Sequence, residues 1–141
     1  MKKIIKESTY GVYSFFVDEE KKVVTAVLNP RIGGVDTAMK EINKATHGKF
    51  RITEVEGSVK LAPKERYIGV AKCNPVDTFD EVTGVRIAEA RAYKQYLRDK
   101  QRVMLAVRDA IDVGLNRITR KLVDIDDQVE RVDYDISRYS K

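Results

Sequence analysis

The stretch KCNPVDTFDEVTG, residues 72–84, holds the side chains of this chain that are best suited to chemistry. It contains the only cysteine, Cys73, together with the aspartates Asp77 and Asp80. A zinc site needs three or four cysteine, histidine or carboxylate ligands, and the only histidine, His47, is distant in the sequence. No third acid gives the spacing of a calcium loop. The sequence therefore predicts no metal site and no cofactor.

Catalysis by the thiol of Cys73 would need a general base within hydrogen-bonding reach. Nothing in the sequence places His47 there. The chain also has no phosphate-binding loop, no nucleophile motif and no pair of carboxylates with an adjacent base. We predict an inert, buried thiol at the end of a strand, in a protein that is not an enzyme.

The same stretch is well suited to joining a sheet to a helix. Pro75 cannot continue a central strand, and Asp80 is a good N-cap for a following helix, with Thr83 as the alternative cap. Gly84 would then lie in the first turns of that helix, where the absence of a side chain permits close approach to a sheet. We therefore interpret residues 72–84 as a joint.

The elements before this joint predict a small α+β domain over residues 1–80. Alternating aromatic and β-branched residues predict strands at 10–16 and 23–28, joined as a hairpin by a polar turn. Apolar residues three or four positions apart predict a short helix at 35–45. Further strands are expected at 49–55 and 66–73, with a brief pairing at 59–61. The expected fold is a small antiparallel sheet with one short helix.

After the joint the pattern becomes that of one long helix over residues 81–141. Apolar residues recur at alternating spacings of three and four near its end, which is typical of a coiled-coil seam. We name these residues the heptad stripe: Ile111, Leu115, Ile118, Leu122, Ile125, Val129, Val132, Ile136 and Tyr139. We expect residues 82–112 to pack on the sheet and residues 115–140 to form a coiled coil between copies of the chain.

The residues in and beside the heptad stripe bear on the number of copies. Leucine at one core position with isoleucine at the other, as in Leu115 and Ile118, favours more than two strands, so a dimer, trimer and tetramer all remain open. In a parallel pairing Lys121 would face Asp126 of a neighbouring helix, which is an attractive pair. The alternative is a long helix that packs its stripe on its own domain.

The net charge of +5 is concentrated in the first part of the long helix. Residues 83–122 contain ten basic and four acidic side chains, which suggests a patch for nucleic acid or for an acidic protein. Tyr93 and Tyr96 interleave with these as candidate stacking groups, although such tyrosines are more often packed in a core. The candidate binding residues are Arg91, Lys94, Arg98, Arg102, Arg108, Arg117, Arg120 and Lys121. The alternative is a solvated helix face.

One sequence pattern in the joint also resembles a known group of proteins. Its residues are Lys72, Cys73, Asp77, Phe79, Asp80, Gly84, Ile87, Ala88, Arg91 and Ala92. The pattern is similar to that of small accessory proteins of phages and prophages of Gram-positive bacteria. Many of those have histidine after the cysteine, where this chain has Asn74. The resemblance implies an accessory protein that binds nucleic acid or blocks a host defence system.

The first expected function is therefore a non-catalytic inhibitor of a host defence system, such as a CRISPR effector nuclease. It would act as a homo-oligomer that occludes a surface of a host protein or protein–nucleic acid complex. A basic protein that binds DNA or RNA is one alternative, and a purely structural oligomerisation module is another. We expect no membrane partner, because no apolar run approaches the roughly 18 residues of a membrane span, and a location in the cytoplasm of the bacterial host.

Overall fold

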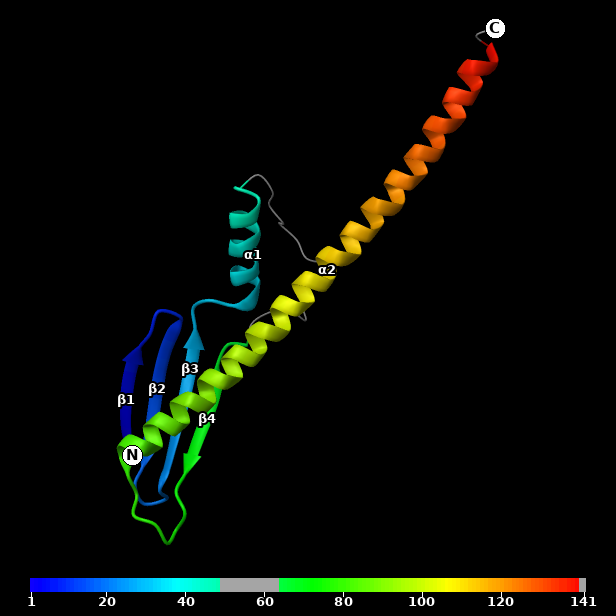
Figure 1. The fold of residues 1–141 in the computed structure, drawn as a ribbon. Coiled ribbons are helices and arrows are strands. Elements are labelled where there is room, and N and C mark those ends of the chain that lie inside the picture. The colour runs from blue at the N-terminus through cyan, green and yellow to red at the C-terminus, as the bar shows by residue number, and fades with distance from the viewer. Residues whose placement is uncertain (49–63, 140–141) are drawn as a thin grey trace. The chain divides into compact units, whose positions relative to one another are not determined.

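The computed structural model describes residues 1–48 and 64–139, which form four strands and two helices (Figure 1). In chain order these are β1 (Lys2–Glu7), β2 (Gly11–Asp18), β3 (Val23–Pro30), α1 (Gly34–Ala45), β4 (Tyr67–Lys72) and α2 (Glu81–Tyr139). The predicted α+β class, with an antiparallel sheet, a short helix and a long carboxy-terminal helix, is confirmed. The strands expected at 49–55 and 59–61 lie outside the described residues.

The four strands form one antiparallel sheet in the order β1-β2-β3-β4. The predicted hairpin is β2–β3, in which Phe15 pairs with Ala26. Burial alternates along β2, where Tyr13, Phe15 and Val17 point into the core. This period of two is the one expected of a strand with one covered face.

Strand β1 was not predicted from the sequence. Its register places Lys2, Ile4 and Lys6 opposite the inward-facing residues of β2, so only one of the three inward positions is apolar. The ammonium groups of Lys2 and Lys6 form ion pairs with Glu81 and Glu89 of α2, at 3.1 and 2.7 Å. These ion pairs with α2 replace apolar contacts along part of β1. The strand therefore lacks the apolar–polar alternation by which a strand is predicted from sequence.

Helix α2 begins as the interpretation of the joint predicts. The carboxylate of Asp80 accepts hydrogen bonds from the backbone N–H of Val82 at 3.1 Å and from the hydroxyl of Thr83 at 2.7 Å. Asp80 is thus the N-cap, and Thr83 lies in the first turn. A Cβ on Gly84 would lie 2.8 Å from Cγ2 of Val24, so this glycine does permit close packing on the sheet.

The first part of α2 lies across one face of the sheet (Figure 1). Ala88, Ala92 and Tyr96 join the buried core formed by β2, β3 and β4. A Cβ on Gly69 of β4 would overlap the carbonyl oxygen of Ala88. The small residues on both sides therefore let the helix backbone approach the strand directly.

Farther along, α2 packs on α1. The side chain of Val103 lies against Gly34 of α1, where a Cβ would be only 2.7 Å from Cβ of Val103. Val107 is also buried, whereas Leu105 between them is 42 % exposed.

The chain forms two units, Met1–Val107 and Arg108–Lys141. The predicted domain boundary between residues 80 and 81 coincides with the start of α2, whereas the division between the units falls inside this helix. The first unit thus includes the sheet, α1 and the part of α2 that covers them. None of the described helices contains a segment that is both long and apolar enough to cross a membrane.

Candidate functional site

The heptad stripe is the most extensive exposed apolar feature of the second unit. Its residues from Leu115 to Tyr139 are 41 % to 83 % exposed, and Ile111 is half-buried. All nine lie in the continuous helix α2, which runs through Gly114 without interruption. The spacing of three and four residues places them on one side of the helix. The structure therefore presents the stripe to solvent within this unit, and the coiled coil itself stays a prediction.

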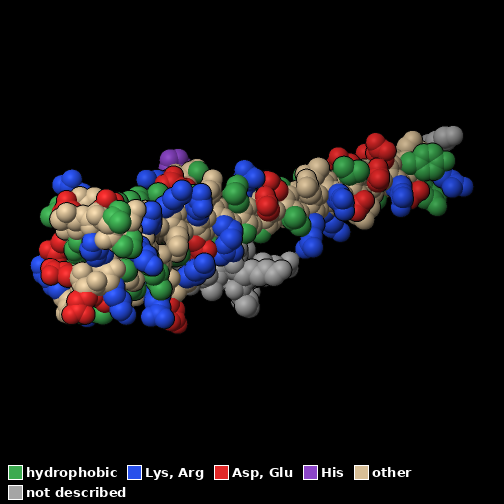
Figure 2. Space-filling view, turned by 90° about the horizontal axis from the view of Figure 1, so that it is seen from below, with side chains coloured by type: hydrophobic (Ala, Val, Ile, Leu, Met, Phe, Trp, Pro, Cys, Tyr) green, Lys and Arg blue, Asp and Glu red, His purple; other side chains and the backbone are tan. Residues whose placement is uncertain are grey.

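Charged side chains accompany the stripe on this helix. Figure 2 shows acidic and basic side chains alternating with hydrophobic ones along it. Lys121 directly precedes Leu122 of the stripe, and Asp126 directly follows Ile125. These positions border a coiled-coil core, where charges of neighbouring helices meet.

The predicted basic residues of the first unit fall on one side of α2, since Arg91, Lys94, Arg98 and Arg102 are spaced by three or four residues. Two of them have structural partners. Arg91 donates to the backbone carbonyl of Val70 at 2.5 Å, and Arg102 donates to the carboxylate of Asp99 at 2.9 Å. Lys94 and Arg98 are exposed. The group predicted for binding is therefore partly engaged in holding β4 and α2.

The remaining predicted basic residues lie in the second unit. Arg108 is paired with Asp109 at 3.6 Å. Arg117, Arg120 and Lys121 are exposed and share one side of the helix, because they too are three or four residues apart.

The two tyrosines suggested as stacking groups belong to an aromatic cluster of the first unit. Tyr96 is 2 % exposed and its ring stacks on that of Tyr10, with centroids 5.4 Å apart. Its hydroxyl donates to the carbonyl of Ile32 at 2.9 Å. Tyr93 lies at the edge of the cluster, 5.1 Å from Tyr10. Tyr96 is therefore a core residue and is not available to stack on a base. The core-packing alternative is confirmed for Tyr96, and the stacking role is wrong for it.

Asp99 is a charged residue in the interior, 8 % exposed. It accepts a hydrogen bond from the hydroxyl of Tyr67 at 2.5 Å and is paired with Arg102. Burial alone would raise the pKa of Asp99, but the hydrogen bonds from Tyr67 and Arg102 outweigh it and hold the pKa below its usual value. Burial and the same hydrogen bond raise the pKa of Tyr67. Sequence reasoning missed this group, because nothing local links Tyr67 to Asp99.

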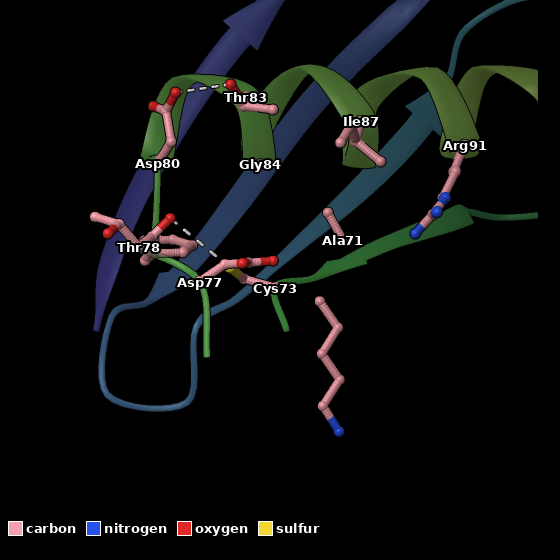
Figure 3. Close-up of a pocket in the computed structure, with 11 residues that line it drawn as sticks. Ala71, Cys73, Asp77, Thr78, Asp80, Thr83, Gly84, Ile87 and Arg91 are labelled. Atoms are coloured by element: carbon pink, nitrogen blue, oxygen red, sulfur yellow. Dashed lines mark hydrogen bonds between the residues drawn. The ribbon is translucent and has the colours of Figure 1, made fainter. Parts of the chain in front are cut away.

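A pocket of about 250 Å³, partly open to solvent, lies between the end of β4 and the start of α2 (Figure 3). The loop between β4 and α2 is fixed by Lys22, whose ammonium group donates to the carbonyls of Pro75 and Asp77 at 3.0 and 2.6 Å. The hydrogen bond from Thr83 is the main cause that lowers the pKa of the exposed Asp80. Asp80 therefore acts here as a cap for the helix.

The thiol of Cys73 lies at this pocket and is only half-buried, so the prediction of a buried thiol is wrong. Its sulfur lies 3.5 and 3.9 Å from the backbone carbonyls of Asn74 and Thr78. Among residues 1–48 and 64–139 there is no cluster of three or more histidine, cysteine or acidic side chains placed to hold a metal ion.

The residues of the phage-protein pattern meet at this pocket. Its lining includes Lys72, Cys73, Asp77, Phe79, Asp80, Gly84, Ile87 and Arg91, and Ala88 and Ala92 are in the core. Comparison with protein-family models, with curated proteins and with solved structures gives no match. The resemblance therefore depends on these residues alone. They pack together where β4 meets α2, and this shared position accounts for their occurrence as one pattern.

Proposed function

We propose that this chain is a non-catalytic binding protein that associates with further copies of itself through the heptad stripe. The observation that carries the proposal is the exposure of large apolar side chains at uninterrupted coiled-coil spacing from Leu115 to Tyr139. Monomeric proteins rarely expose contiguous apolar surfaces of this kind, which usually mark a binding interface.

The energetics support self-association. Full burial of a leucine, isoleucine or valine side chain contributes about 1.5–3 kcal/mol, and each copy brings several. Association costs about 4–15 kcal/mol in lost translational and rotational freedom. The stripe is therefore long enough to offset this cost, provided that most of its side chains become buried against another copy.

For the biological role, we propose an inhibitor of a host defence system, such as a CRISPR effector nuclease, on the basis of the pattern at residues 72–92. An oligomer would present several first units together and would occlude a surface more effectively than one copy. The exposed Lys94 and Arg98 favour a second candidate, a protein that binds DNA or RNA through its basic helix face.

Self-association is tested with the double variant Ile118→Asp/Ile125→Asp, which places charges in the stripe. The matched control is Val113→Asp/Val123→Asp, since both valines are 50 % and 55 % exposed on the same helix but lie outside the stripe. We expect light scattering to show an oligomer for the native chain and the control, and a monomer for the stripe variant. A monomeric native chain would refute the proposal.

The two candidate roles are separated by different measurements. An inhibitor should reduce DNA cleavage by a susceptible CRISPR effector nuclease, and the stripe variant should do so less effectively than the control variant. A nucleic-acid-binding protein should retard a labelled single-stranded DNA, with an affinity that falls steeply between low and physiological salt. Failure to inhibit across a panel of such nucleases would remove the first role, and the absence of a salt-dependent DNA complex would remove the second.

A further inference from the structure

We infer that the copies associate in parallel, as a bundle of more than two helices. This inference rests on the proposed self-association and adds to it the number and direction of the chains. It is drawn from which residue type fills each position of the exposed stripe. The first core position, a, holds Leu115, Leu122, Val129 and Ile136, and the second, d, holds Ile111, Ile118, Ile125, Val132 and Tyr139.

The filling of the core positions disfavours a parallel dimer. Two-stranded parallel coiled coils prefer β-branched residues at a and leucine at d. This helix has the reverse in two successive heptads, with Leu115 before Ile118 and Leu122 before Ile125. Val129 and Val132 are β-branched at both positions. The first arrangement shifts the preference to three or four strands, and the second lacks the leucine at d that dimers prefer.

The bordering charges favour a parallel direction. In a parallel bundle, Lys121 lies opposite Asp126 of the next chain, and the following pair, Gln128 with Asp133, brings no like charges together. In an antiparallel pair, the residues directly after position d of one helix face the residues directly after position d of the other helix. Asp112, Asp126 and Asp133 occupy such positions, so that like charges would face each other.

A parallel bundle determines the valency of the protein. All helices have their amino ends at the same end of the bundle, so the first units of three or four chains emerge there together. A partner with repeated or symmetric binding surfaces would then engage several first units at once. Linked sites of this kind gain affinity through effective concentration, without any new contact.

The number of chains is tested by sedimentation equilibrium of the native chain and of an exchange variant. The variant Leu115→Ile/Ile118→Leu/Leu122→Ile/Ile125→Leu keeps the composition but restores the pattern preferred by dimers. We expect a trimer or tetramer for the native chain and a dimer for the variant. A native dimer, or a variant that keeps the native mass, overturns this inference and leaves the proposed self-association standing. A native monomer overturns both.

The direction is tested by exchanging the charges of one bordering pair. Lys121→Asp and Asp126→Lys should each lower the association constant, by about twofold for every pair lost, and the double variant should recover most of the loss. Recovery is expected only if the two positions face each other in a parallel bundle. A double variant that associates no better than the weaker single variant overturns the parallel arrangement.

Discussion

The two units of this chain use opposite kinds of residues on the same helix. Where α2 covers the sheet, the contact depends on glycines. A Cβ on Gly69 would overlap the carbonyl oxygen of Ala88, and a Cβ on Gly84 would lie 2.8 Å from Cγ2 of Val24. In the second unit, the helix exposes leucine, isoleucine and valine at regular spacing, and Gly114 has open space around it.

This difference shows how one helix serves two kinds of packing. Small residues allow backbones to approach closely, which suits a fixed contact within one chain. Large branched residues in a regular array suit knobs-into-holes packing against another helix. Substitutions that test the same residue type in both units therefore sharpen the comparison.

The largest effect is expected for Gly69→Ala in the first unit. The added Cβ would overlap the carbonyl oxygen of Ala88 and the amide nitrogen of Ala92. Backbone atoms of a helix cannot move aside as a flexible side chain can, so the free energy of unfolding should fall by at least about 3 kcal/mol. Denaturant unfolding followed by tyrosine fluorescence reports mainly on this unit, which holds five of the seven tyrosines. A loss below about 1 kcal/mol would show that the helix and strand are less closely packed.

An intermediate effect is expected for Asp99→Asn. The pKa of Asp99 is lowered in the folded chain, so its stabilising contribution is complete above the unfolded value, roughly pH 4, and is lost as the pH falls through the folded value. At pH 7 the substitution should lower the free energy of unfolding by about 1.5–3 kcal/mol.

The control for Asp99 is the pH dependence itself. Unfolding of the native chain and the variant should be compared at one protein concentration, because association also contributes to stability. The difference between them should shrink as the solution is acidified below about pH 4. A difference that does not change with pH would indicate a loss of packing, and would contradict the role given to the charge.

The smallest effect is expected for Gly114→Ala, the counterpart of Gly69→Ala. No atom lies within 4 Å of a Cβ at this position, and alanine is favoured over glycine inside a helix by about 0.5–1 kcal/mol. The thermal midpoint of the helical circular dichroism signal should therefore rise slightly, and the oligomer mass should not change. A loss of stability would mean that this position is covered in the oligomer.

Several features were predictable because their signals are local. The hairpin β2–β3, the helix α1 and the cap at Asp80 follow from alternation, helical spacing and capping chemistry within short stretches. The exposed stripe follows from spacing along a single helix. The same reasoning failed where a residue's environment is set by distant parts of the chain, as for the degree of burial of Cys73 and the hydrogen bond between Tyr67 and Asp99.

The sequence by itself determined the class of the fold, the joint between sheet and helix, and the stripe, because hydrophobic periodicity reports directly on local structure. The tertiary structure alone decided that Lys2 and Lys6 hold an edge strand to α2. It also decided that Asp99 is buried between Tyr67 and Arg102. The physical reason is that burial and these pairings depend on which residues meet in space. Lys2, Lys6 and Tyr67 lie far along the chain from Glu81, Glu89 and Asp99, and only Arg102 is a neighbour of its partner on the same helix.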